Sequence, residues 1–374
     1  MNKDLYIGVM SGTSADGIDV VLAESGEKHF QLVNHISEPV SESLRQEIKQ
    51  LCSSGNDEIH LATTLGIKLS KLTAVLIHRL LKETQISHSD VRAIGYHGQT
   101  VRHQPTTNHP YSVQIGCPST LAFLTGITTV TDFRMADIAA GGQGAPLVPA
   151  FHQHVFQSAG EHRFILNIGG IANISYLPAD IRKDVIGFDT GPGNTLLDEW
   201  IMLHLGRSFD DNGAWAATGK VMHRLLDSMM TDEYLLKPLT KSTGKEHFNL
   251  DWLAKHLQSV SSFTPEDVQR TLLEFTACSI AKEIKNLTPA KATQTSQIYI
   301  CGGGIKNTAL MNSLKSQLGD IKISSTEELG IPPQQVEGSA FAWLASQTIQ
   351  GKPGNLPCVT GASQKRILGG IYLS

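Results

Sequence analysis

The sequence predicts an α/β protein made of two lobes, and three observations lead to that prediction. The chain has 374 residues, whereas a domain usually holds about 100–200 residues, so two domains are expected. Apolar strand-like runs alternate with helical patterns along most of the chain, as is typical of α/β folds. Each half also opens on three strands, the first two of which form a hairpin around a glycine turn. We therefore expect two α/β lobes with a cleft between them.

The first half is expected to contain three strands, two helices and a further strand, over residues 4–10, 18–24, 29–35, 41–52, 58–83 and 91–96. Residues 126–132 are the expected hinge, because no low-complexity tract or long linker separates the lobes.

The second half repeats the hairpin-led start, with strands expected over residues 163–168, 171–176 and 184–188. Helices are expected near 194–205, 214–230, 249–258 and 265–287, followed by a strand at 297–301 and a helix near 305–317. The sequences of the two halves share too little to establish a duplication.

Composition excludes several classes of protein. Hydrophobic residues make up 40% and charged residues 18% of the chain, which is typical of a globular protein. Lys and Arg number 31 against 35 Asp and Glu, and no basic cluster contains aromatic residues, so nucleic acid is not an expected partner. The expected partner is a small molecule.

Compartment and metal content are also constrained. No apolar stretch approaches the roughly 18 residues of a membrane span, and the N-terminus runs into a strand without a signal-peptide pattern, so we expect a cytoplasmic protein. The five cysteines are scattered and never in C-x-x-C spacing, which predicts reduced thiols rather than disulfides or a zinc site. The fifteen histidines lack metal-binding spacing, so no structural metal site is expected.

The first hairpin carries unusual chemistry in its turn. Residues 8–19 read G-V-M-S-G-T-S-A-D-G-I-D, which is longer and more polar than chain reversal requires. Backbone N–H groups with Thr13 and Ser14 would bind phosphate, and the glycines would let it approach. Asp16 or Asp19 would hold hydrated Mg²⁺ through water. The alternative is a structural turn whose side chains bond their own backbone.

Two familiar phosphate motifs are absent. Residues 213–221 have one residue too many for a P-loop and end in Val, and Leu196 replaces the third glycine of a dinucleotide fingerprint after Asp189. Asp189 nevertheless ends an expected strand, beside a helix that Asn194 or Thr195 would cap, and ligands of α/β folds bind at such places. Alternatively, Asp189 only accepts backbone N–H bonds.

Gly302, Gly303 and Gly304 follow an expected strand. Three successive glycines cost backbone entropy, about 1 kcal/mol each relative to Ala, so we expect a nucleotide base or ribose to lie against them. A plain strand-to-helix turn would need only one glycine.

Polar residues of the first half offer further candidates. Arg134 lies between two aspartates before the glycine-rich residues 141–146 and would clamp a carboxylate in bidentate fashion, or form only a surface ion pair. His97 follows a strand, where a structural histidine is the alternative to a functional one. Glu337 stands near the start of an apolar helix, where it either has a catalytic role or serves the helix dipole alone.

Taken together, the motifs resemble those of one family over nearly the whole chain. They are G-V-M-S-G-T-S-A-D-G-I-D (8–19), Y-H-G-Q-T (96–100), T-D-F-R-M-A-D (131–137), G-G-Q-G-A-P (141–146), N-I-G-G-I-A-N (167–173), F-D-T-G-P-G-N (188–194), K-S-T-G-K-E (241–246) and C-G-G-G (301–304). In this order they resemble the anhydro-N-acetylmuramic acid kinase family. The resemblance implies the two-lobed actin/hexokinase-like ATPase fold with ribonuclease H-like lobes.

The resemblance also implies the domain layout, with an N-terminal lobe over 1–130 completed by 355–374, and a second lobe over 131–354 that holds the sugar site, the catalytic Asp and the adenosine-binding glycines. It implies a homodimer that uses ATP and Mg²⁺, the ion being carried with ATP. The implied reaction opens the 1,6-anhydro bridge of anhydro-N-acetylmuramic acid with water and phosphorylates the 6-oxygen, giving N-acetylmuramic acid 6-phosphate for murein recycling.

The family roles carry over by position. Asp189 matches the general base, and Glu337 matches the second active-site carboxylate. The sugar or its lactyl carboxylate would contact His97, Arg134, Gly191, Gly193 and Asn194. The ATP phosphates and adenosine would contact Gly12, Thr13, Ser14, Ala15, Asp16, Gly17, Ile18, Asp19, Asn167, Gly169, Gly170, Gly302, Gly303 and Gly304.

Two rival functions stay open at this point. An ordinary sugar kinase would place a base beside a free hydroxyl and would not activate water. An ATP-switched partner-binding or filament protein would hydrolyse ATP slowly, without stimulation by small sugars.

Overall fold

The chain forms two compact units in the computed structural model, which describes residues 4–12, 15–27, 29–239, 241–288 and 295–374. The first unit comprises Met1–Val155 and Gln335–Ser374, and the second comprises Phe156–Gln334.

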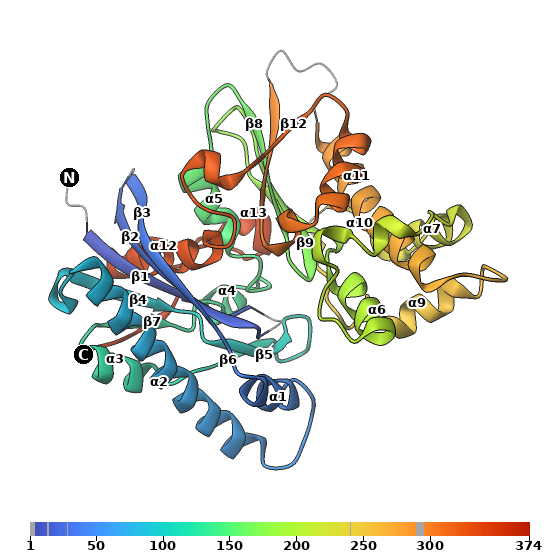
Figure 1. The fold of residues 1–374 in the computed structure, drawn as a ribbon. Coiled ribbons are helices and arrows are strands. Elements are labelled where there is room, and N and C mark those ends of the chain that lie inside the picture. The colour runs from blue at the N-terminus through green and yellow to red at the C-terminus, as the bar shows by residue number, and fades with distance from the viewer. Residues whose placement is uncertain (1–3, 13–14, 28, 240, 289–294) are drawn as a thin grey trace. The chain divides into compact units, whose positions relative to one another are not determined.

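The first unit is built on a mixed sheet with strand order β13-β7-β4-β1-β2-β3. Strand β1 pairs antiparallel with β2, and β2 with β3, whereas β4 runs parallel to both β1 and β7 (Figure 1). The strands of the unit are β1 (Asp4–Met10), β2 (Gly17–Gly26), β3 (His29–Pro39), β4 (Val91–Tyr96), β5 (Gln99–Gln104), β6 (Tyr111–Ile115), β7 (Thr129–Thr131) and β13 (Gly370–Tyr372). The helices are α1 (Glu42–Leu51), α2 (Glu58–Thr84), η1 (His88–Asp90), α3 (Pro118–Thr125), α4 (Met135–Ala139), α5 (Val148–Phe156), α12 (Val336–Ile349) and α13 (Pro357–Thr360).

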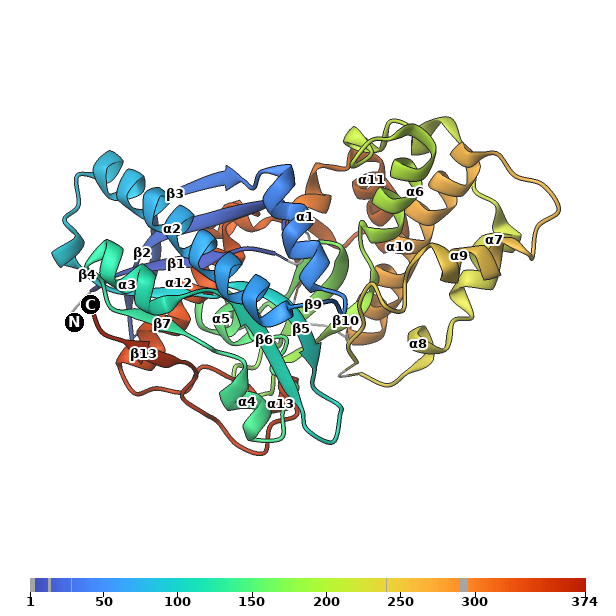
Figure 2. The same ribbon diagram turned by 90° about the horizontal axis from the view of Figure 1, so that it is seen from below.

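Helices cover both faces of this sheet, because its strands are apolar on both sides. Ile7, Val9 and Ile94 point to one face and share a core with α2, which Figure 2 shows running along the sheet. At Gly8 and Gly95, an added Cβ would point to the other face of the sheet, where it would run into the backbone of α12 at Gly338 and Phe341. These glycines therefore let α12 pack directly on the strands.

The second unit has a sheet of order β10-β9-β8-β11-β12. Its strands are β8 (His162–Ile168), β9 (Ile171–Leu177), β10 (Ile186–Pro192), β11 (Ser296–Cys301) and β12 (Lys322–Ser325). The helices are α6 (Thr195–Leu205), η2 (Asp211–Gly213), η3 (Ala216–Thr218), α7 (His223–Met230), α8 (Glu233–Leu236), α9 (Leu250–Leu257), α10 (Pro265–Leu287), η4 (Gly303–Lys306), α11 (Thr308–Leu318) and η5 (Thr326–Leu329).

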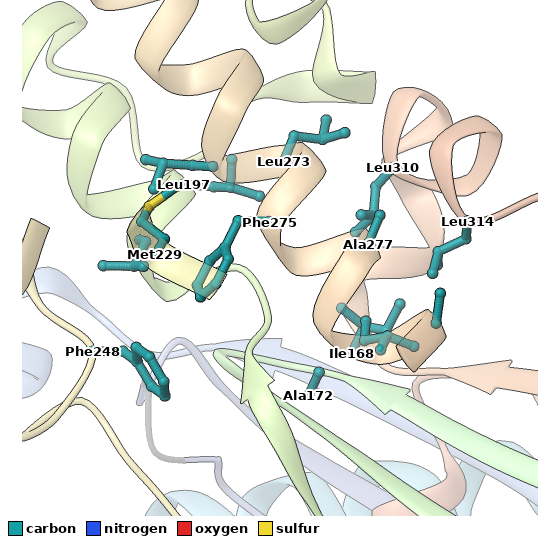
Figure 3. Packing of buried hydrophobic residues seen from close by; sticks show 14 of the residues in the cluster. Ile168, Ala172, Leu197, Met229, Phe248, Leu273, Phe275, Ala277, Leu310 and Leu314 are labelled. Atoms are coloured by element: carbon teal, nitrogen blue, oxygen red, sulfur yellow. The ribbon is translucent and has the colours of Figure 1, made fainter. Parts of the chain in front are cut away.

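The core of the second unit lies between its sheet and the helices α6, α10 and α11. Figure 3 shows Ile168 and Ala172 of the sheet below Ala277 of α10, with Leu310 and Leu314 of α11 beside them. Farther along α10, Phe275 shares the same core with Phe248.

The two units have the same strand topology. In the first, the order β3-β2-β1-β4-β7 has two antiparallel pairs followed by two parallel pairs. In the second, β10-β9-β8-β11-β12 repeats that pattern. The predicted α/β class and the paired hairpin-led lobes are therefore confirmed.

The expected domain boundaries were wrong. The first unit extends to Val155, and its C-terminal part starts at Gln335 rather than at residue 355. The expected hinge at 126–132 contains β7, which pairs with both β4 and β13 and so belongs inside the first sheet. Arg134 and Glu337 consequently belong to the first unit, whereas the expectation put them in the second.

Two element predictions also need correction. The helix expected over 214–230 is broken into η3 and α7, and Gly219 between them has extended backbone, with φ −92° and ψ 174°. The strand expected at 184–188 runs on as β10 to Pro192, with a register shift between Asp189 and Gly191. Asp189 therefore lies within the strand and does not end it.

Candidate active site

The turn of the first hairpin is held from inside the first unit by Gln99. The hydroxyl of Ser11 lies 2.7 Å from Oε1 of Gln99 and 3.0 Å from the carbonyl oxygen of Gly17. Nε2 of Gln99 donates to the carbonyl of Gly12 at 3.1 Å. The backbone of Gly12 is thereby fixed next to the strand end that carries Gln99.

Other phosphate candidates in this turn have structural tasks. Ala15 is buried, has a positive φ of 53° and donates its N–H to Gly12, so that N–H points into the turn. Gly17 and Ile18 belong to β2, and the side chain of Ile18 lies in the core. Thr13 and Ser14 lie outside the described residues.

The two aspartates of the hairpin differ in their partners. The exposed carboxylate of Asp16 pairs with Arg45 at 2.7 Å. Asp19 accepts a hydrogen bond from the hydroxyl of Ser37, and burial raises the pKa of its carboxyl. No group of three or more metal-binding side chains occurs among the residues that the structure describes.

His97 and Arg134 meet at the carboxyl ends of the parallel strands β4 and β7. Nδ1 of His97 lies 2.9 Å from the carbonyl oxygen of Gly98, so it carries the proton, and Nε2 accepts from the guanidinium of Arg134 at 3.1 Å. Burial and the Arg134 charge lower the pKa of His97 to about 3. His97 is therefore neutral near pH 7, and both of its ring nitrogens are engaged.

The Arg134 guanidinium lies among two carboxylates and a loop carbonyl. It donates to the carbonyl of Gly144 at 2.7 Å. Burial lowers the pKa of Arg134 to about 10, while the charges of Glu337 and Asp137 act in the opposite direction. Glu337, in the first turn of α12, is thus close enough to Arg134 to stabilise its positive charge. A Glu that served only the helix dipole would not need to lie near this guanidinium.

Asp137 fixes the loop to which Arg134 is attached. Its fully buried carboxylate accepts from the N–H of Gly144 at 2.8 Å, from Nδ2 of Asn355 at 2.6 Å and from the hydroxyl of Thr360 at 2.7 Å. Asn355 and Thr360 belong to the C-terminal segment. This segment therefore holds the loop whose carbonyl orients Arg134.

Asp189 lies within β10 of the second unit, the strand that matches β3 in the common strand order. Its Oδ2 accepts from the backbone N–H of Thr243 at 3.0 Å and from the hydroxyl of Ser242 at 3.1 Å. Among the residues that the structure describes, Oδ2 is the only carboxylate oxygen of Asp189 that accepts a hydrogen bond. The pKa of Asp189 is raised to about 6, chiefly by desolvation and to a smaller extent by the Glu246 charge, while the two hydrogen bonds act in the opposite direction. A carboxylate with such a pKa is ionised at neutral pH and basic enough to accept a proton.

The glycine turn Gly169–Gly170 lies against the start of α6. The N–H of Asn194 donates to the carbonyl of Gly169 at 2.8 Å, and the N–H of Gly193 donates to that of Gly170 at 2.9 Å. Asn194 stands at the N-cap position of α6 as expected, but its side chain donates to Gly169 at 3.0 Å and makes no capping hydrogen bond.

The three glycines after β11 are needed for different reasons. Gly302 has a φ of 81° and lies against Asn167, so a side chain there would be strained and obstructed. Gly304 packs on Ile168. Gly303 alone is exposed, with no atom of the described residues within 4 Å of an added Cβ. The packing of the chain itself thus requires glycine at 302 and 304, and only Gly303 offers open backbone.

The structure thus gathers the candidate residues into separate sets. His97, Arg134 and Glu337 come together in the first unit; Asp189 meets Ser242 and Thr243 in the second. Gly169–Gly170 meets Gly193–Asn194, and Gly302 meets Asn167. Sequence reasoning missed Gln99 and Asp137 as supports, although both stand inside quoted motifs. It also missed the buried pair of Lys241 with Glu283, for which spacing gave no signal.

Both units have the same ribonuclease H-like topology, and both carry polar residues and glycines at the carboxyl ends of their parallel strands. These features define the class of two-lobed, actin/hexokinase-like ATPase-fold proteins. The family model described as anhydro-N-acetylmuramic acid kinase matches residues 4–374, and the chain belongs to that family. It is similar to curated relatives of that name from Coxiella burnetii, at 45% identity over 100% of this chain and 98% of the relative, and from Shewanella loihica, at 47% over 100% and 99%.

Among solved structures, component A of (R)-2-hydroxyglutaryl-CoA dehydratase from Acidaminococcus fermentans is similar at 11% identity and a TM-score of 0.48, over 93% of this chain and 100% of that chain. In the part of the chain that the structure describes, no helix is both long and apolar enough to cross a membrane.

Proposed function

We propose that this protein is an ATP-dependent kinase acting on 1,6-anhydro-N-acetylmuramic acid. Water opens the anhydro bridge, and the released 6-oxygen takes the γ-phosphoryl group, giving N-acetylmuramic acid 6-phosphate and ADP. This reaction serves murein recycling and amino-sugar catabolism. Membership of the family supports the activity, and the observation that carries the chemistry is Asp189, a partly buried carboxylate with a pKa of about 6.

Asp189 acts as the general base. Its ionised carboxylate removes a proton from the water that attacks the anomeric carbon, while Ser242 and Thr243 hold Oδ2 in a fixed orientation. The bond from the anomeric carbon to the 6-oxygen breaks, and that oxygen forms its new bond to phosphorus as ADP leaves. Because phosphorus captures the oxygen as its negative charge develops, no strong acid is needed to protonate it.

The first unit supplies sugar-binding groups. Arg134 binds the lactyl carboxylate, since a guanidinium and a carboxylate make bidentate hydrogen bonds. Neutral His97 orients the guanidinium through Nε2 and contacts the sugar with its ring. Glu337 assists opening of the bridge. In the second unit, Gly191, Gly193 and Asn194 bind sugar close to the base.

Nucleotide contacts come from glycine-containing turns. The hairpin from Gly12 to Asp19 binds the ATP phosphates, with Asn167, Gly169 and Gly170 adding contacts, and Gly302–Gly304 lies by the adenosine chiefly through the open backbone of Gly303. Mg²⁺, when bound with ATP, neutralises phosphate charge. Asp19 fits a water-mediated contact with that ion better than Asp16, whose carboxylate is paired with Arg45.

We further propose that the protein works in the cytoplasm as a homodimer. Its substrate there would be a small sugar, without a nucleic-acid or membrane partner. Light scattering of the purified chain, with a mass twice that of the monomer, would support the dimer, and the monomer mass would contradict it.

Steady-state ADP release tests the proposed activity against the two rival functions. The rate is measured with no sugar, with 1,6-anhydro-N-acetylmuramic acid, and with free N-acetylmuramic acid or N-acetylglucosamine. The account expects strong stimulation by the anhydro sugar alone. Equal or greater stimulation by the free sugars would indicate an ordinary sugar kinase, and slow turnover that ignores all three would indicate an ATP-switched protein.

A further inference from the structure

Lys241 and Glu283 form a fully buried ion pair in the second unit. Nζ of Lys241 lies 2.9 Å from Oε1 of Glu283, and the side chains are only 3% and 5% exposed. Nζ also approaches the carbonyl oxygens of Tyr234 and Leu235 at 3.4 and 3.5 Å. Lys and Glu are rarely buried to this extent, and apolar residues often give equal or greater stability at such sites. Stability alone therefore does not account for the pair.

The pair is joined directly to Asp189 through the backbone of Lys241. The carbonyl of Lys241 accepts the N–H of Asp189 at 3.0 Å. The next two residues, Ser242 and Thr243, donate the hydrogen bonds to Oδ2 of Asp189. We call residues 241–243 the strap. Glu283 belongs to the long helix α10, so the ion pair anchors the strap to the core of the unit.

Tyr234 completes this arrangement. Its hydroxyl donates to the carbonyl of Asp189 at 2.7 Å, and its ring lies 5.2 Å from Nζ of Lys241. The backbone N–H, the backbone carbonyl and the carboxylate of Asp189 are thus each held by a residue of this network.

From this geometry we propose that Lys241 and Glu283 are positioning residues, which hold the strap so that Ser242 and Thr243 keep Asp189 oriented and ionised as a base. The catalytic part of this inference rests on the proposed function. Without the anchor, the strap loosens and the two donors leave Oδ2. Because those hydrogen bonds favour the charged carboxylate, their loss raises the Asp189 pKa.

The direct effect of neighbouring charges on the Asp189 pKa must be distinguished from the effect of a loosened strap. Charged and titratable groups around Asp189 and the strap include Glu246 and Lys245 beyond the strap, Tyr234 on α8, Lys241 itself, and Lys282 and Glu283 on α10. Removing the Glu283 charge leaves Lys241 unpaired, and its positive field would lower the Asp189 pKa. Loosening of the strap raises it. The direction in which the Asp189 pKa shifts in Glu283→Gln therefore shows which of the two effects is larger.

The experiment is a titration of the Asp189 carboxyl in the intact protein without substrate, by carbon-13 NMR of labelled aspartate, with the signal assigned through Asp189→Asn. In Glu283→Gln the Asp189 midpoint should rise by about half a pKa unit or more. Glu274→Gln, on the same helix, is the matched control and should leave the midpoint unchanged. An unchanged or lowered midpoint in Glu283→Gln would overturn the proposal.

Two further variants keep the test decisive. If the unpaired lysine prevents folding of Glu283→Gln, the double variant Lys241→Met/Glu283→Gln lacks both charges and should show a rise at least as large, because no unpaired lysine opposes it. Ser242→Ala alone should raise the midpoint, but should add little in the Glu283→Gln background, because both changes remove the same hydrogen bond. Fully additive shifts would contradict action through the strap.

The titration does not depend on turnover. Wild-type protein that fails to release ADP with the anhydro sugar would overturn the proposed function, and the midpoints would still decide whether the pair acts through the strap. In an active enzyme, the acid limb of kcat/KM for the sugar should move to higher pH in Glu283→Gln, with partial recovery of the rate above pH 8. A uniform loss of rate with an unmoved limb would indicate a merely structural pair and would contradict the proposal.

Discussion

The two units share a strand order but carry different chemistry at equivalent places. The turn between the first two strands is Ser11–Asp16 in the first unit and only Gly169–Gly170 in the second. After the fourth strand of the common order, the first unit has His97, which is bonded to Arg134, whereas the second has Gly302 and the open backbone of Gly303. The common topology fixes where functional groups can stand, and the local sequence decides what they are.

The two units also differ in the protonation of their buried groups. In the first unit, burial beside a cation lowers the pKa of His97 to about 3, so this group does not titrate near neutral pH. In the second, burial raises the pKa of Asp189 to about 6, which is close to neutral pH, where a general base works best. The proposed function therefore places proton transfer in the second unit and anion recognition in the first.

The largest expected effect comes from removing the one proton acceptor in this comparison. Asp189→Asn should lower kcat by about 10³-fold or more while ATP binding is retained, since general-base catalysis contributes about 10²–10⁴-fold. Turnover with the anhydro sugar and ATP binding by calorimetry would check this. The variant should melt no lower than wild type at pH 7.5, because the partly buried charge is removed; full activity would refute the role of Asp189.

The second-largest effect is expected on the stability of the first unit, where α12 packs directly on the strands. Gly95→Ala places a Cβ against the backbone of α12 at Phe341, and overpacking of this kind costs about 1–3 kcal/mol. Thermal or urea unfolding should show a clear loss of stability. Gly55→Ala is the control, because no atom of the described residues lies within 4 Å of its added Cβ. If both variants unfold alike, direct packing of α12 on the strands does not limit stability.

Anion recognition in the first unit is tested by Arg134→Lys. A lysine keeps the charge but loses the planar fork, so KM for the sugar should rise about tenfold, with kcat changed less. His97→Asn should give a smaller effect in the same direction, because it disturbs only the partner of the guanidinium. An unchanged KM in Arg134→Lys would exclude Arg134 from substrate binding.

The pH profile sharpens the contrast between the units. A base must be deprotonated, so kcat/KM for the sugar should fall about tenfold per pH unit below pH 6 and level off above it. The neutral His97 adds no limb between pH 5 and 8. A limb near pH 6 that persists in Asp189→Glu at the same pH would point to another group.

The smallest effect is expected at Gly303. Because an added methyl group meets no described atom, Gly303→Ala should leave stability unchanged, while KM for ATP rises a few-fold if adenosine lies against that backbone. Unfolding and ATP kinetics are measured together. An unchanged KM would remove Gly303 from the nucleotide site.

Much of the fold was accessible from sequence because its signals are local. Alternating apolar residues and glycine turns predicted β1, β2, β8 and β9, and the long amphipathic pattern predicted α10. The break between η3 and α7 was missed, although Gly219, a poor helix former, stands inside the expected range. The domain boundary was not accessible from local signals, because β7 belongs to the first sheet through its pairing with β4 and β13, which are distant in sequence.

The site divides in the same way. Asp189, Arg134 and Glu337 stand in recognisable motifs, and the sequence was sufficient to select them. The partners that set their properties come from remote segments: Asn355 and Thr360 for Asp137, and Glu283 for Lys241. Side-chain hydrogen bonds and burial decide pKa values, and a single sequence contains no record of either.

Turnover in oxygen-18 water, followed by mass spectrometry of the sugar product, tests most directly whether Asp189 activates water for a reaction that joins ring opening to phosphorylation. The account predicts a product with the label on the anomeric oxygen and the phosphate on an unlabelled 6-oxygen, formed in step with ADP. A phosphorylated sugar that retains its anhydro bridge, or ADP formed without any sugar product, would contradict it.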